Sequence, residues 1–596
     1  MNDAEVDSHT LPSFLRLRVA ESPAAIAFWQ EADHTGWDPI TWQEFELRVA
    51  RLRDALHAAG LRKGERLALI APVSLEWELV HHAALAMGAV VVGIDAHDLP
   101  TRIAILAEQA DVAGFVTSDA RTLASVLPQR LARVRFVLDL GSGAEIPAGV
   151  RGFNWAEFNA LAHSATSQPA RPTADDLATI IFTSGTTGDP RGIAYSHRQV
   201  CLAIDAICDV FSFVDQRSRL LCWLPLSNLL QRMVNLAGMR KGAATYLLGD
   251  PRRVLTALPT AAPDIFIGVP RFYEKLYAGI CDRIATEPRL RRGLIRRAWS
   301  IGRRYSKHRL ENRPVPVWLR GVHWIVDRTI LVRVRRLMGA RLRFLVTGSA
   351  PTPKHLLEEF HALGWVVLEA YGLSENVLPM AMNRPGDYRF GTVGRPLPGN
   401  EIVMGHDGTI KVRGPGVFTG YVGKGRDSSF DDEGFYATGD SGQWDDDGRV
   451  ILTGRTGDMI KTSTGRRIAP AGVEASLRKV PGVDQAVLIG AGRKCAVALC
   501  SLQSTLDRAG RESLKAALNE QVELINENER PRAIGVIERP LSIELGELTA
   551  NLKLRRGTIE MTQDGLIRKL YETLDASEQA TGAAIVFDGQ CEDHTP

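Results

Sequence analysis

Apolar residues recur along the chain in short runs, and the segments between the runs have helical spacing. The runs are rich in Val, Ile, Leu and Phe, and examples are Leu67–Ile70, Ala89–Ile94, Phe115–Thr117, Phe136–Leu140, Thr179–Thr183, Ile265–Val269 and Phe344–Thr347. A run that is apolar at every position predicts a strand buried on both faces, with helices covering the sheet. The pattern therefore predicts an α/β protein built on mostly parallel sheets.

One intervening segment, Phe45–Ala59, shows the helical spacing clearly. Its apolar residues fall three and four positions apart, at Phe45, Val49, Leu52, Leu56 and Ala59. Such spacing places them on one face of a helix. Gly60 follows directly and is expected to end that helix.

The chain of 596 residues is too long for one hydrophobic core, so more than one domain is expected. A polar stretch rich in Ala and Pro, Ser164 to Asp176, predicts a loop between two subdomains. Near Arg455 the sequence pattern changes to one typical of a compact α+β domain. We expect a large domain over residues 1–455, a small one over 456–575 and a loose tail over 576–596.

Composition excludes several classes of protein. A net charge of +3 gives no global field for nucleic acid. The longest apolar stretch, Ala83 to Ile94, is shorter than the ~20 residues of a membrane span, and the N-terminus lacks the pattern of a signal peptide. Seven scattered cysteines without a CxxC pair indicate reduced thiols, which favours a cytoplasmic protein.

The most informative segment begins where the predicted strand Thr179–Thr183 ends. Small and hydroxyl residues follow one another there: Thr183, Ser184, Gly185, Thr186, Thr187 and Gly188. Arg191 adds a cation three positions after Gly188. Backbone N–H groups of small residues can close around anionic oxygens, and hydroxyls add donors. The Walker pattern GxxxxGK[ST] is absent. The order of residues after a buried strand favours a phosphate loop over an ordinary surface turn.

This loop resembles the TSGTTGxPKG signature of the adenylate-forming (ANL) superfamily, which contains acyl-CoA synthetases, peptide-synthetase adenylation domains and luciferases. Five more segments resemble motifs of that family, in its order: Gly348-Ser-Ala-Pro351, Tyr371-Gly-Leu-Ser-Glu375, Thr438-Gly-Asp440, Gly454-Arg-Thr-Gly-Asp458 and Leu548-Thr-Ala-Asn-Leu-Lys-Leu-Arg-Arg556. One short match is weak, but six in order are specific, and they span nearly the whole chain. The resemblance also implies a β-barrel-like subdomain and a mobile C-terminal domain.

The resemblance implies a role for individual residues. Lys553, Arg191 and Ser374 would contact the reacting phosphates, and Glu375 would hold Mg²⁺, a hard cation that prefers oxygen ligands. Beside the loop, the residues expected to bind ATP or AMP are Gly348, Ser349, Ala350, Tyr371, Gly372, Asp440 and Arg455, with Tyr371 on the adenine and the last two on the ribose. Lys461 and Gly465 would approach coenzyme A, and Gly457 would be the hinge.

Several segments are similar to the long-chain acyl-CoA synthetase branch. Trp223-Leu-Pro-Leu-Ser-Asn228 and Gly268-Val-Pro-Arg-Phe-Tyr-Glu-Lys275 carry this similarity, which implies an apolar acyl pocket in which Trp223 and Asn228 meet the substrate. The branch also has a helical insertion, which falls here between Lys275 and Arg341 and is rich in arginine. We favour a solvated helix packed by its apolar side over a membrane face, so membrane contact would be at most peripheral. A homodimer is compatible with the sequence.

In the mechanism that this resemblance implies, the carboxylate attacks the α-phosphorus of ATP, which gives acyl-AMP and releases pyrophosphate. The CoA thiol then attacks the acyl carbonyl and AMP leaves. Because two anions meet in the first step, charge neutralisation carries the catalysis. Two departures fall on this step: Arg191 replaces the family lysine, and Asn228 replaces a histidine.

These departures leave alternatives to a full acyl-CoA synthetase. The enzyme could chiefly form the thioester from an acyl-adenylate made elsewhere, or it could load a carrier protein instead of CoA. A non-catalytic nucleotide-binding module is a further alternative, against which the retained Glu375 and Lys553 argue.

Overall fold

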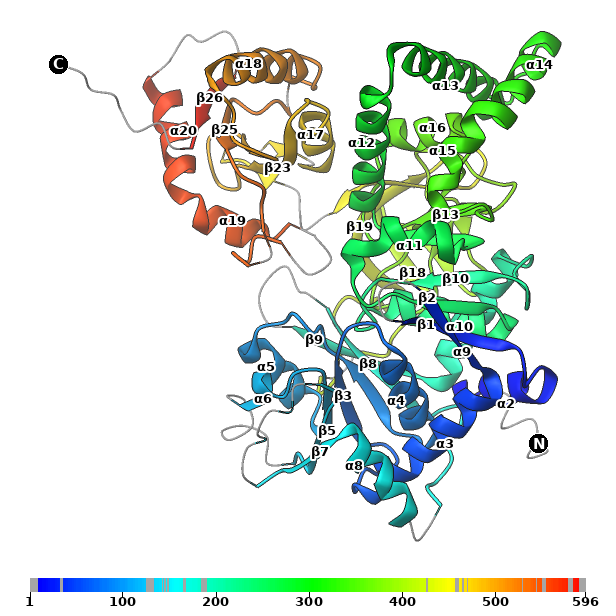
Figure 1. The fold of residues 1–596 in the computed structure, drawn as a ribbon. Helices are drawn as coiled ribbons and strands as arrows, with labels where there is room; N and C mark the ends of the chain where they lie inside the picture. The colour runs from blue at the N-terminus through cyan, green and yellow to red at the C-terminus, as the bar shows by residue number, and fades with distance from the viewer. Residues whose placement is uncertain are drawn as a thin grey trace. The chain divides into compact units, whose positions relative to one another are not determined.

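The structure is a computed structural model of the chain. It describes residues 9–32, 36–124, 133–141, 143, 146, 149–164, 168–183, 190–424, 427–455, 460–463, 466–468, 470–527, 529–542, 544–548, 554–576 and 583–588. The chain forms two compact units: the first consists of Met1–Val403, Lys411–Tyr436 and Trp444–Ile451, and the second of Met404–Ile410, Ala437–Gln443 and Leu452–Pro596. The predicted α/β class is confirmed (Figure 1).

The largest sheet of the first unit has seven strands. Their order is β7 (Arg151–Asn154), β6 (Phe136–Asp139), β5 (Val112–Thr117), β3 (Arg66–Ile70), β4 (Val90–Gly93), β8 (Leu177–Thr183) and β9 (Arg191–Ser196). All neighbours are parallel except β8 and β9. Ala68 and Ile70 of β3 pack with Ile103 of α5 (Pro100–Gln109), whereas Leu67 and Leu69 are buried on the opposite face. Burial on both faces explains why the apolar runs are continuous.

Helix α3 (Trp42–Ala58) matches the predicted helix and begins three residues earlier. Thr41 caps it, because its hydroxyl accepts from the Glu44 N–H at 3.2 Å while the Glu44 carboxylate accepts from the Thr41 N–H at 2.9 Å. The five predicted face residues are all buried. Gly60 follows with φ +103°, a conformation that favours glycine and ends the helix.

Three further sheets contain the remaining strands up to Arg455. One has the order β10 (Arg219–Cys222), β11 (Ala244–Leu247), β1 (Ile26–Ala32) and β2 (Gly36–Thr41). The next has β12 (Ile265–Gly268), β13 (Phe344–Thr347), β14 (Val367–Tyr371), β15 (Ala381–Met382) and β16 (Arg395–Pro396), of which the first three are parallel. The last has β17 (Glu401–Met404), β18 (Thr409–Arg413), β19 (Tyr436–Trp444) and β20 (Val450–Arg455).

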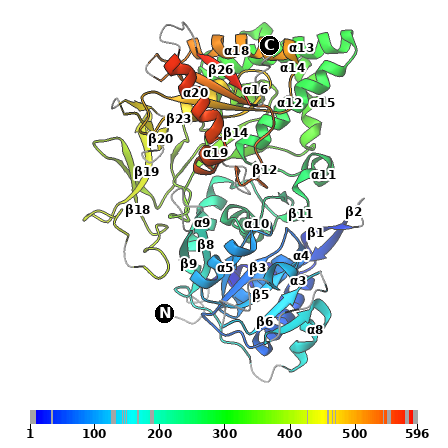
Figure 2. The ribbon, with the colours of Figure 1, turned by 90° about the vertical axis from the view of Figure 1, so that its left-hand side faces the viewer.

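Helices surround these sheets. In the first unit they are α2 (Leu11–Glu21), α3, α4 (Leu75–Ala86), α5, α6 (Arg121–Ala124), α8 (Trp155–Ala160), α9 (His197–Val210), α10 (Leu229–Lys241), α11 (Val254–Ala261), α12 (Pro270–Thr286), α13 (Arg289–Leu310), α14 (Val317–Val326), α15 (Val332–Arg335) and α16 (Lys354–Ala362). Helices α13 and α14 lie at one end of this unit, and α3 and α8 lie at the other (Figures 1 and 2). In the part of the chain that the structure describes, none of the helices has both the length and the apolar composition to cross a bilayer.

The second unit is built on the sheet β23 (Val483–Ile489), β24 (Val497–Leu502), β25 (Ala533–Ile537) and β26 (Ala584–Phe587). One face packs against α17 (Pro470–Leu477) and α18 (Arg508–Glu523), and the other against α19 (Arg556–Thr562) and α20 (Asp564–Ala576). Two short strands, β21 (Ile460–Lys461) and β22 (Arg467–Ile468), pair in antiparallel fashion.

Strand β26 corrects the sequence analysis, which placed residues 584–587 in a loose tail. The strand pairs in parallel with β25, from Ala533 opposite Ala584 to Val536 opposite Phe587. Phe587 packs into the core on one face of the sheet, and Val586 contacts the core on the other. A four-residue apolar run is too short to show periodicity, but it suffices to complete an existing sheet edge.

The cysteines that the structure describes are free thiols: Cys201, Cys208, Cys222, Cys281, Cys495 and Cys500. Burial raises the pKa of the Cys201 and Cys500 thiols to about 12 and that of Cys208 to about 11. Cys201, Cys208 and Cys500 therefore behave as small core side chains. Cys591 lies outside the described residues.

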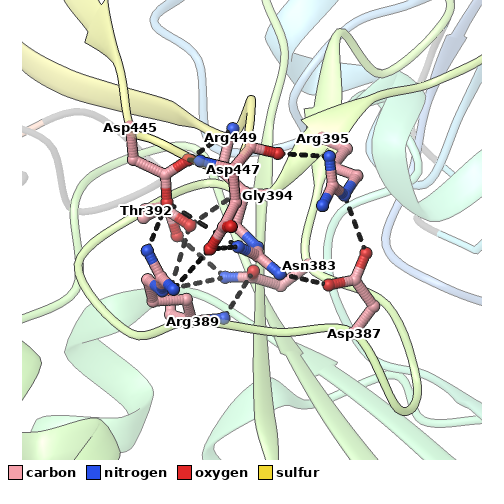
Figure 3. A network of polar contacts seen from close by, with 9 residues as sticks. All are labelled: Asn383, Asp387, Arg389, Thr392, Gly394, Arg395, Asp445, Asp447 and Arg449. Carbon is pink, nitrogen blue, oxygen red and sulfur yellow. Dashed lines mark hydrogen bonds and ion pairs between the residues drawn. The ribbon is translucent and has the colours of Figure 1, made fainter.

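A network of arginines and aspartates joins loops of the first unit (Figure 3). Arg389 pairs with Asp445 at 2.9 Å and with Asp447 at 2.5 Å, and Arg449 pairs with Asp447 at 2.8 Å. Asp387 accepts from both Arg449, at 2.5 Å, and Arg395, at 3.1 Å. The hydrogen bond to Arg449 lowers the pKa of the Asp387 carboxyl. Because several charges share partners, the network stabilises the loops more than isolated surface pairs do.

Gly394, which directly precedes Arg395 of this network, is expected to tolerate no side chain. Its φ is +82°, and a Cβ would lie 2.1 Å from the carbonyl carbon of Met382. Gly394→Ala should lower the free energy of unfolding by about 3 kcal/mol or more, from backbone strain and overlap together. Gly386→Ala is the matched control, since φ is +83° there but the space is open. In chemical denaturation the control should lose about 1 kcal/mol; equal losses for both variants would contradict the steric argument.

Candidate active site

The predicted phosphate loop is carried by the β8–β9 hairpin. Strand β8 ends at Thr183 and β9 begins at Arg191, and these two residues are Cα partners in the antiparallel pair. The pairing holds the two ends of the loop side by side. The cradle residues between them that the sequence predicts, Ser184, Gly185, Thr186, Thr187 and Gly188, lie outside the described residues.

The segment after β14 lies against this hairpin. Tyr371 ends β14, and Ser374 and Glu375 follow it. The Tyr195 hydroxyl of β9 donates to the backbone carbonyl of Ser374, and the Tyr421 hydroxyl donates to Oε1 of Glu375 at 2.9 Å. In addition, the Val422 N–H donates to the carbonyl of Gly192 at 2.8 Å. These contacts bring the hairpin and the Ser374–Glu375 turn into one site.

Arg191 joins the same group through an aromatic ring. Its guanidinium carbon lies 5.1 Å from the centre of the Tyr421 ring, within the range of a cation–π contact. Three of the four residues predicted to be catalytic are therefore close together: Arg191 and Glu375 share Tyr421, and Ser374 contacts Tyr195. Lys553, the fourth, lies outside the described residues.

The tyrosines around Glu375 stay protonated at neutral pH. Burial, and after it the negative charge of Glu375, raises the pKa of Tyr195, Tyr421 and Tyr436 above the ordinary value. A phenol that keeps its proton can donate a hydrogen bond but cannot neutralise a cation. The hydrogen bond from Tyr421 thus fixes the position of the Glu375 carboxylate through a neutral donor, which suits a ligand of a hard divalent cation.

Removing the hydroxyl of Tyr421 is expected to loosen this carboxylate. Tyr421→Phe keeps the ring beneath Arg191 but removes the donor to Glu375. Since a hydrogen bond to a charged group contributes about 1.5–3 kcal/mol, pyrophosphate exchange at limiting Mg²⁺ should slow by about tenfold. Tyr195→Phe is the comparison, because that hydroxyl contacts the Ser374 carbonyl and not the carboxylate. An unchanged Mg²⁺ dependence of Tyr421→Phe would contradict the assignment of Glu375.

The predicted adenine-binding residues lie at the ends of β13 and β14. Thr347 and Glu369 are partners in this parallel pair, so Gly348 comes beside Ala370. A Cβ at Gly348 would lie 3.1 Å from the Ala370 carbonyl oxygen, which explains the glycine. Ser349, with φ +70°, and Ala350 are exposed. The carboxyl ends of parallel strands are where α/β proteins bind ligands, and Tyr371 and Gly372 stand at the end of β14.

Asn228 and Trp223 already have structural partners. Asn228 caps α10, because its Oδ1 accepts from the Leu230 N–H at 3.0 Å. Trp223 is buried, donates from Nε1 to the Ile267 carbonyl at 2.8 Å, and stacks on Phe266 at 5.5 Å. Asparagine is among the best helix caps, so the residue that replaces the family histidine has a local structural role. The predicted contact of both residues with the acid stays a prediction.

The predicted ribose-binding residues belong to the second unit and form a pair of their own. Arg455 Nε lies 2.6 Å from Oδ1 of Asp440, whose N–H donates to the Thr438 hydroxyl at 3.1 Å. Lys461 is exposed in β21, opposite Arg467. The predicted hinge residue Gly457 and the predicted CoA-proximal Gly465 lie outside the described residues.

Sequence reasoning missed the tyrosines that organise the site. Tyr195 lies in β9 and Tyr421 lies in a loop far along the chain. The alternation along β9 is a signal that could have found Tyr195, since Ile193 and Tyr195 are both buried there. Nothing local marks Tyr421, because its partners Arg191 and Glu375 are distant in sequence.

Comparison with known proteins shows the family of the chain. Residues 15–422 match the AMP-binding enzyme family and residues 457–574 match the AMP-binding enzyme C-terminal domain. The long-chain-fatty-acid–CoA ligase FadD15 of Mycobacterium bovis is 28% identical over 550 residues, covering 88% of this chain and 90% of that protein. The putative fatty-acid–CoA ligase fadD11 of Mycobacterium tuberculosis is 30% identical over 422 residues, or 67% and 74% of the two chains.

A solved structure shows the same fold. ATP-bound MatB from Rhodopseudomonas palustris superposes with a TM-score of 0.69 at 22% identity, covering 93% of this chain and 99% of that one. The family match extends over more than half of the chain and includes the β8–β9 hairpin and the Ser374–Glu375 turn. The chain therefore belongs to the AMP-binding enzyme family, the adenylate-forming superfamily, in its long-chain acyl-CoA synthetase branch.

Proposed function

We propose that the chain is an AMP-forming acid–thiol ligase that joins a long-chain or bulky apolar carboxylic acid to coenzyme A. The observation that carries this proposal is the group formed by Arg191, Tyr421 and Glu375 beside the paired ends of the β8–β9 hairpin. A cation, a neutral donor and a carboxylate at the carboxyl end of a sheet suit a nucleoside triphosphate with its metal ion. The names of the relatives favour fatty acids as substrates.

Adenylation is assigned to the residues of this group. The Glu375 carboxylate is a hard oxygen ligand held by a phenol that stays protonated, so it fits Mg²⁺, which would screen the phosphate charges. Arg191 would face the outer phosphates, and Ser374 would donate to a phosphate oxygen. Tyr371 and the loop Gly348–Ala350 would bind the adenine, with Asp440 and Arg455 on the ribose. Lys553 would bring a second cation to the carboxylate and the α-phosphate.

Thioester formation would follow in a second conformation of the enzyme. The small domain, which we place at 456–575, would turn about Gly457, withdraw Lys553 and bring Lys461 and Gly465 toward the pantetheine of CoA. The thiol then attacks the acyl carbonyl and AMP leaves. Because a free thiol has a pKa of about 8.5, orientation contributes more than a strong base.

Two assays test this proposal. One supplies ATP, Mg²⁺, CoA and a panel of acids of increasing chain length, and acyl-CoA and AMP are measured by mass spectrometry. The other supplies pre-made acyl-AMP and CoA. We expect turnover in both, with a preference for long or bulky acids. Turnover in the acyl-AMP assay but not in the ATP assay would reject the adenylation half of the proposal. Turnover only when a phosphopantetheine carrier protein replaces CoA would reject CoA as the acceptor.

A further inference from the structure

Residues 549–553 of the second unit end in the predicted catalytic lysine and lie outside the described residues, but the chain is anchored on both sides of them. Leu548 and Leu554 form an antiparallel bridge, and the Arg555 N–H donates to the Glu547 carbonyl at 2.9 Å. Both leucines also pack against the core on the α19–α20 face of the sheet. The short segment therefore leaves and re-enters the fold at neighbouring positions.

An ion pair anchors the first of these positions. The Glu547 side chain is fully buried, and its two carboxylate oxygens accept from the Arg539 guanidinium at 2.7 Å and 2.8 Å. The same carboxylate accepts from the Ser542 N–H at 3.1 Å. A bidentate pair fixes the orientation of both groups as well as their distance.

A second ion pair anchors the other position. Arg556 begins α19, three residues after Lys553, and its guanidinium lies 2.6 Å and 2.8 Å from the two carboxylate oxygens of Glu474 in α17. It also donates to the Leu488 carbonyl in β23 at 3.1 Å, while the Leu488 N–H donates to Glu474 at 2.7 Å. The start of α19 is thereby tied to both α17 and β23.

Stability alone does not explain these two pairs. Burying a carboxylate is costly, and replacing a buried pair by apolar residues of similar volume often leaves a protein equally stable or more so. Apolar side chains do not supply the fixed orientation of a bidentate pair. Orientation matters for adenylation, since an error of about 1 Å in the placement of a catalytic group can cost about 10²-fold in rate.

We propose that these two ion pairs position Lys553 for the adenylation step. Their four members are positioning residues, which act through Lys553 rather than on the substrate. They fix the residues on both sides of the segment that carries the lysine, and so limit the directions in which its ammonium can extend. The inference rests on the proposed function, because it requires that Lys553 acts in acyl-AMP formation.

Single-turnover rates of the two half-reactions test this proposal. The double variant Arg539→Met/Glu547→Leu removes both charges together, so no buried charge is left unpaired and the chain should still fold. Acyl-AMP formation at saturating ATP and acid should slow by about tenfold or more. Thioester formation from pre-made acyl-AMP and CoA should stay within about twofold. Arg556→Lys, which keeps the charge but loses the planar fork, should slow the same step as the double variant.

Arg511→Met/Glu538→Leu is the matched control, because it removes another bidentate pair of the same unit, with contacts of 2.8 Å and 2.5 Å. This pair lies on the opposite face of the sheet, where the Arg511 guanidinium lies over the Phe587 ring. The control should change the melting temperature as much as the first double variant does, and it should leave both half-reactions unchanged.

A cycle with Lys553→Ala shows whether the pair acts through the lysine. In that background Arg539→Met/Glu547→Leu should slow acyl-AMP formation no further, because residues that act as a unit are not additive. Equal slowing in both backgrounds would overturn the proposal, as would equal slowing of both half-reactions or an unchanged adenylation rate in the folded double variant. If Lys553→Ala by itself left acyl-AMP formation unchanged, the role of Lys553 in the proposed function would fail first, and this inference with it.

Discussion

Glu375→Gln is expected to slow acid-dependent ATP–pyrophosphate exchange by about 10²–10³-fold, the size of effect seen when one electrostatic group is removed from a charged transition state. The carboxylate of the acid and the triphosphate are both anions, so their approach needs a neutralising metal ion. Glutamine has nearly the same shape and can still accept from the Tyr421 hydroxyl, which now contacts Oε1 at 2.9 Å. The variant therefore removes the charge and keeps the geometry.

Two measurements separate this loss from a general defect. Raising the Mg²⁺ concentration should restore part of the exchange, because a neutral amide oxygen is a weaker ligand for a hard cation and not an absent one. Thioester formation from pre-made acyl-AMP and CoA should stay within about threefold of the unaltered enzyme, since that step involves no triphosphate. Exchange that survives at more than a third of its original rate would remove Glu375 from the metal site.

Lys553→Ala should impair acyl-AMP formation and leave thioester formation intact. We expect a loss of about 10²–10³-fold in acyl-AMP formation, because a cation that neutralises the attacking carboxylate and the α-phosphate acts only in that transition state. Thioester formation from supplied acyl-AMP should be retained. Single-turnover measurements of each half-reaction show this directly, with radiolabelled ATP for the first and with mass spectrometry of acyl-CoA for the second.

Lys569→Ala is the matched control, because it removes the same charge from an exposed position on α20. It should leave both half-reactions unchanged. If Lys553→Ala impaired the two half-reactions equally, the residue would act in binding or folding and not in adenylation. If it impaired neither, the assignment of the C-terminal motif would fail.

Strands buried on both faces were predictable from the sequence, because apolar residues predominate in them. Leu67–Ile70 and Phe344–Thr347 agree with β3 and β13 to within one residue. Edge strands are different, since one partner suffices to hold them and their sequence need carry no pattern. Strand β26 is of this kind: four residues near the end of the chain complete the sheet beside β25.

The candidate site was predictable only in part, for a related reason. Arg191, Ser374 and Glu375 stand in recognisable local motifs, and the structure brings them together. Tyr421 connects two of them, Arg191 and Glu375, from a loop without any motif. Tertiary contacts between distant segments leave no periodic signal in a single sequence. The capping role of Asn228 was missed as well, although asparagine before an apolar helical segment is a usual start signal.

The burial of two cysteine thiols affects how readily the proposed acyl-adenylate could acylate the enzyme itself. An acyl-adenylate is a mixed anhydride that acylates any thiolate within reach, including one belonging to the enzyme. With a pKa of about 12, the thiols of Cys201 and Cys500 are ionised in only about one molecule in 10⁵ at neutral pH. Because a protonated thiol is a poor nucleophile, we expect these two side chains to react slowly with such an intermediate.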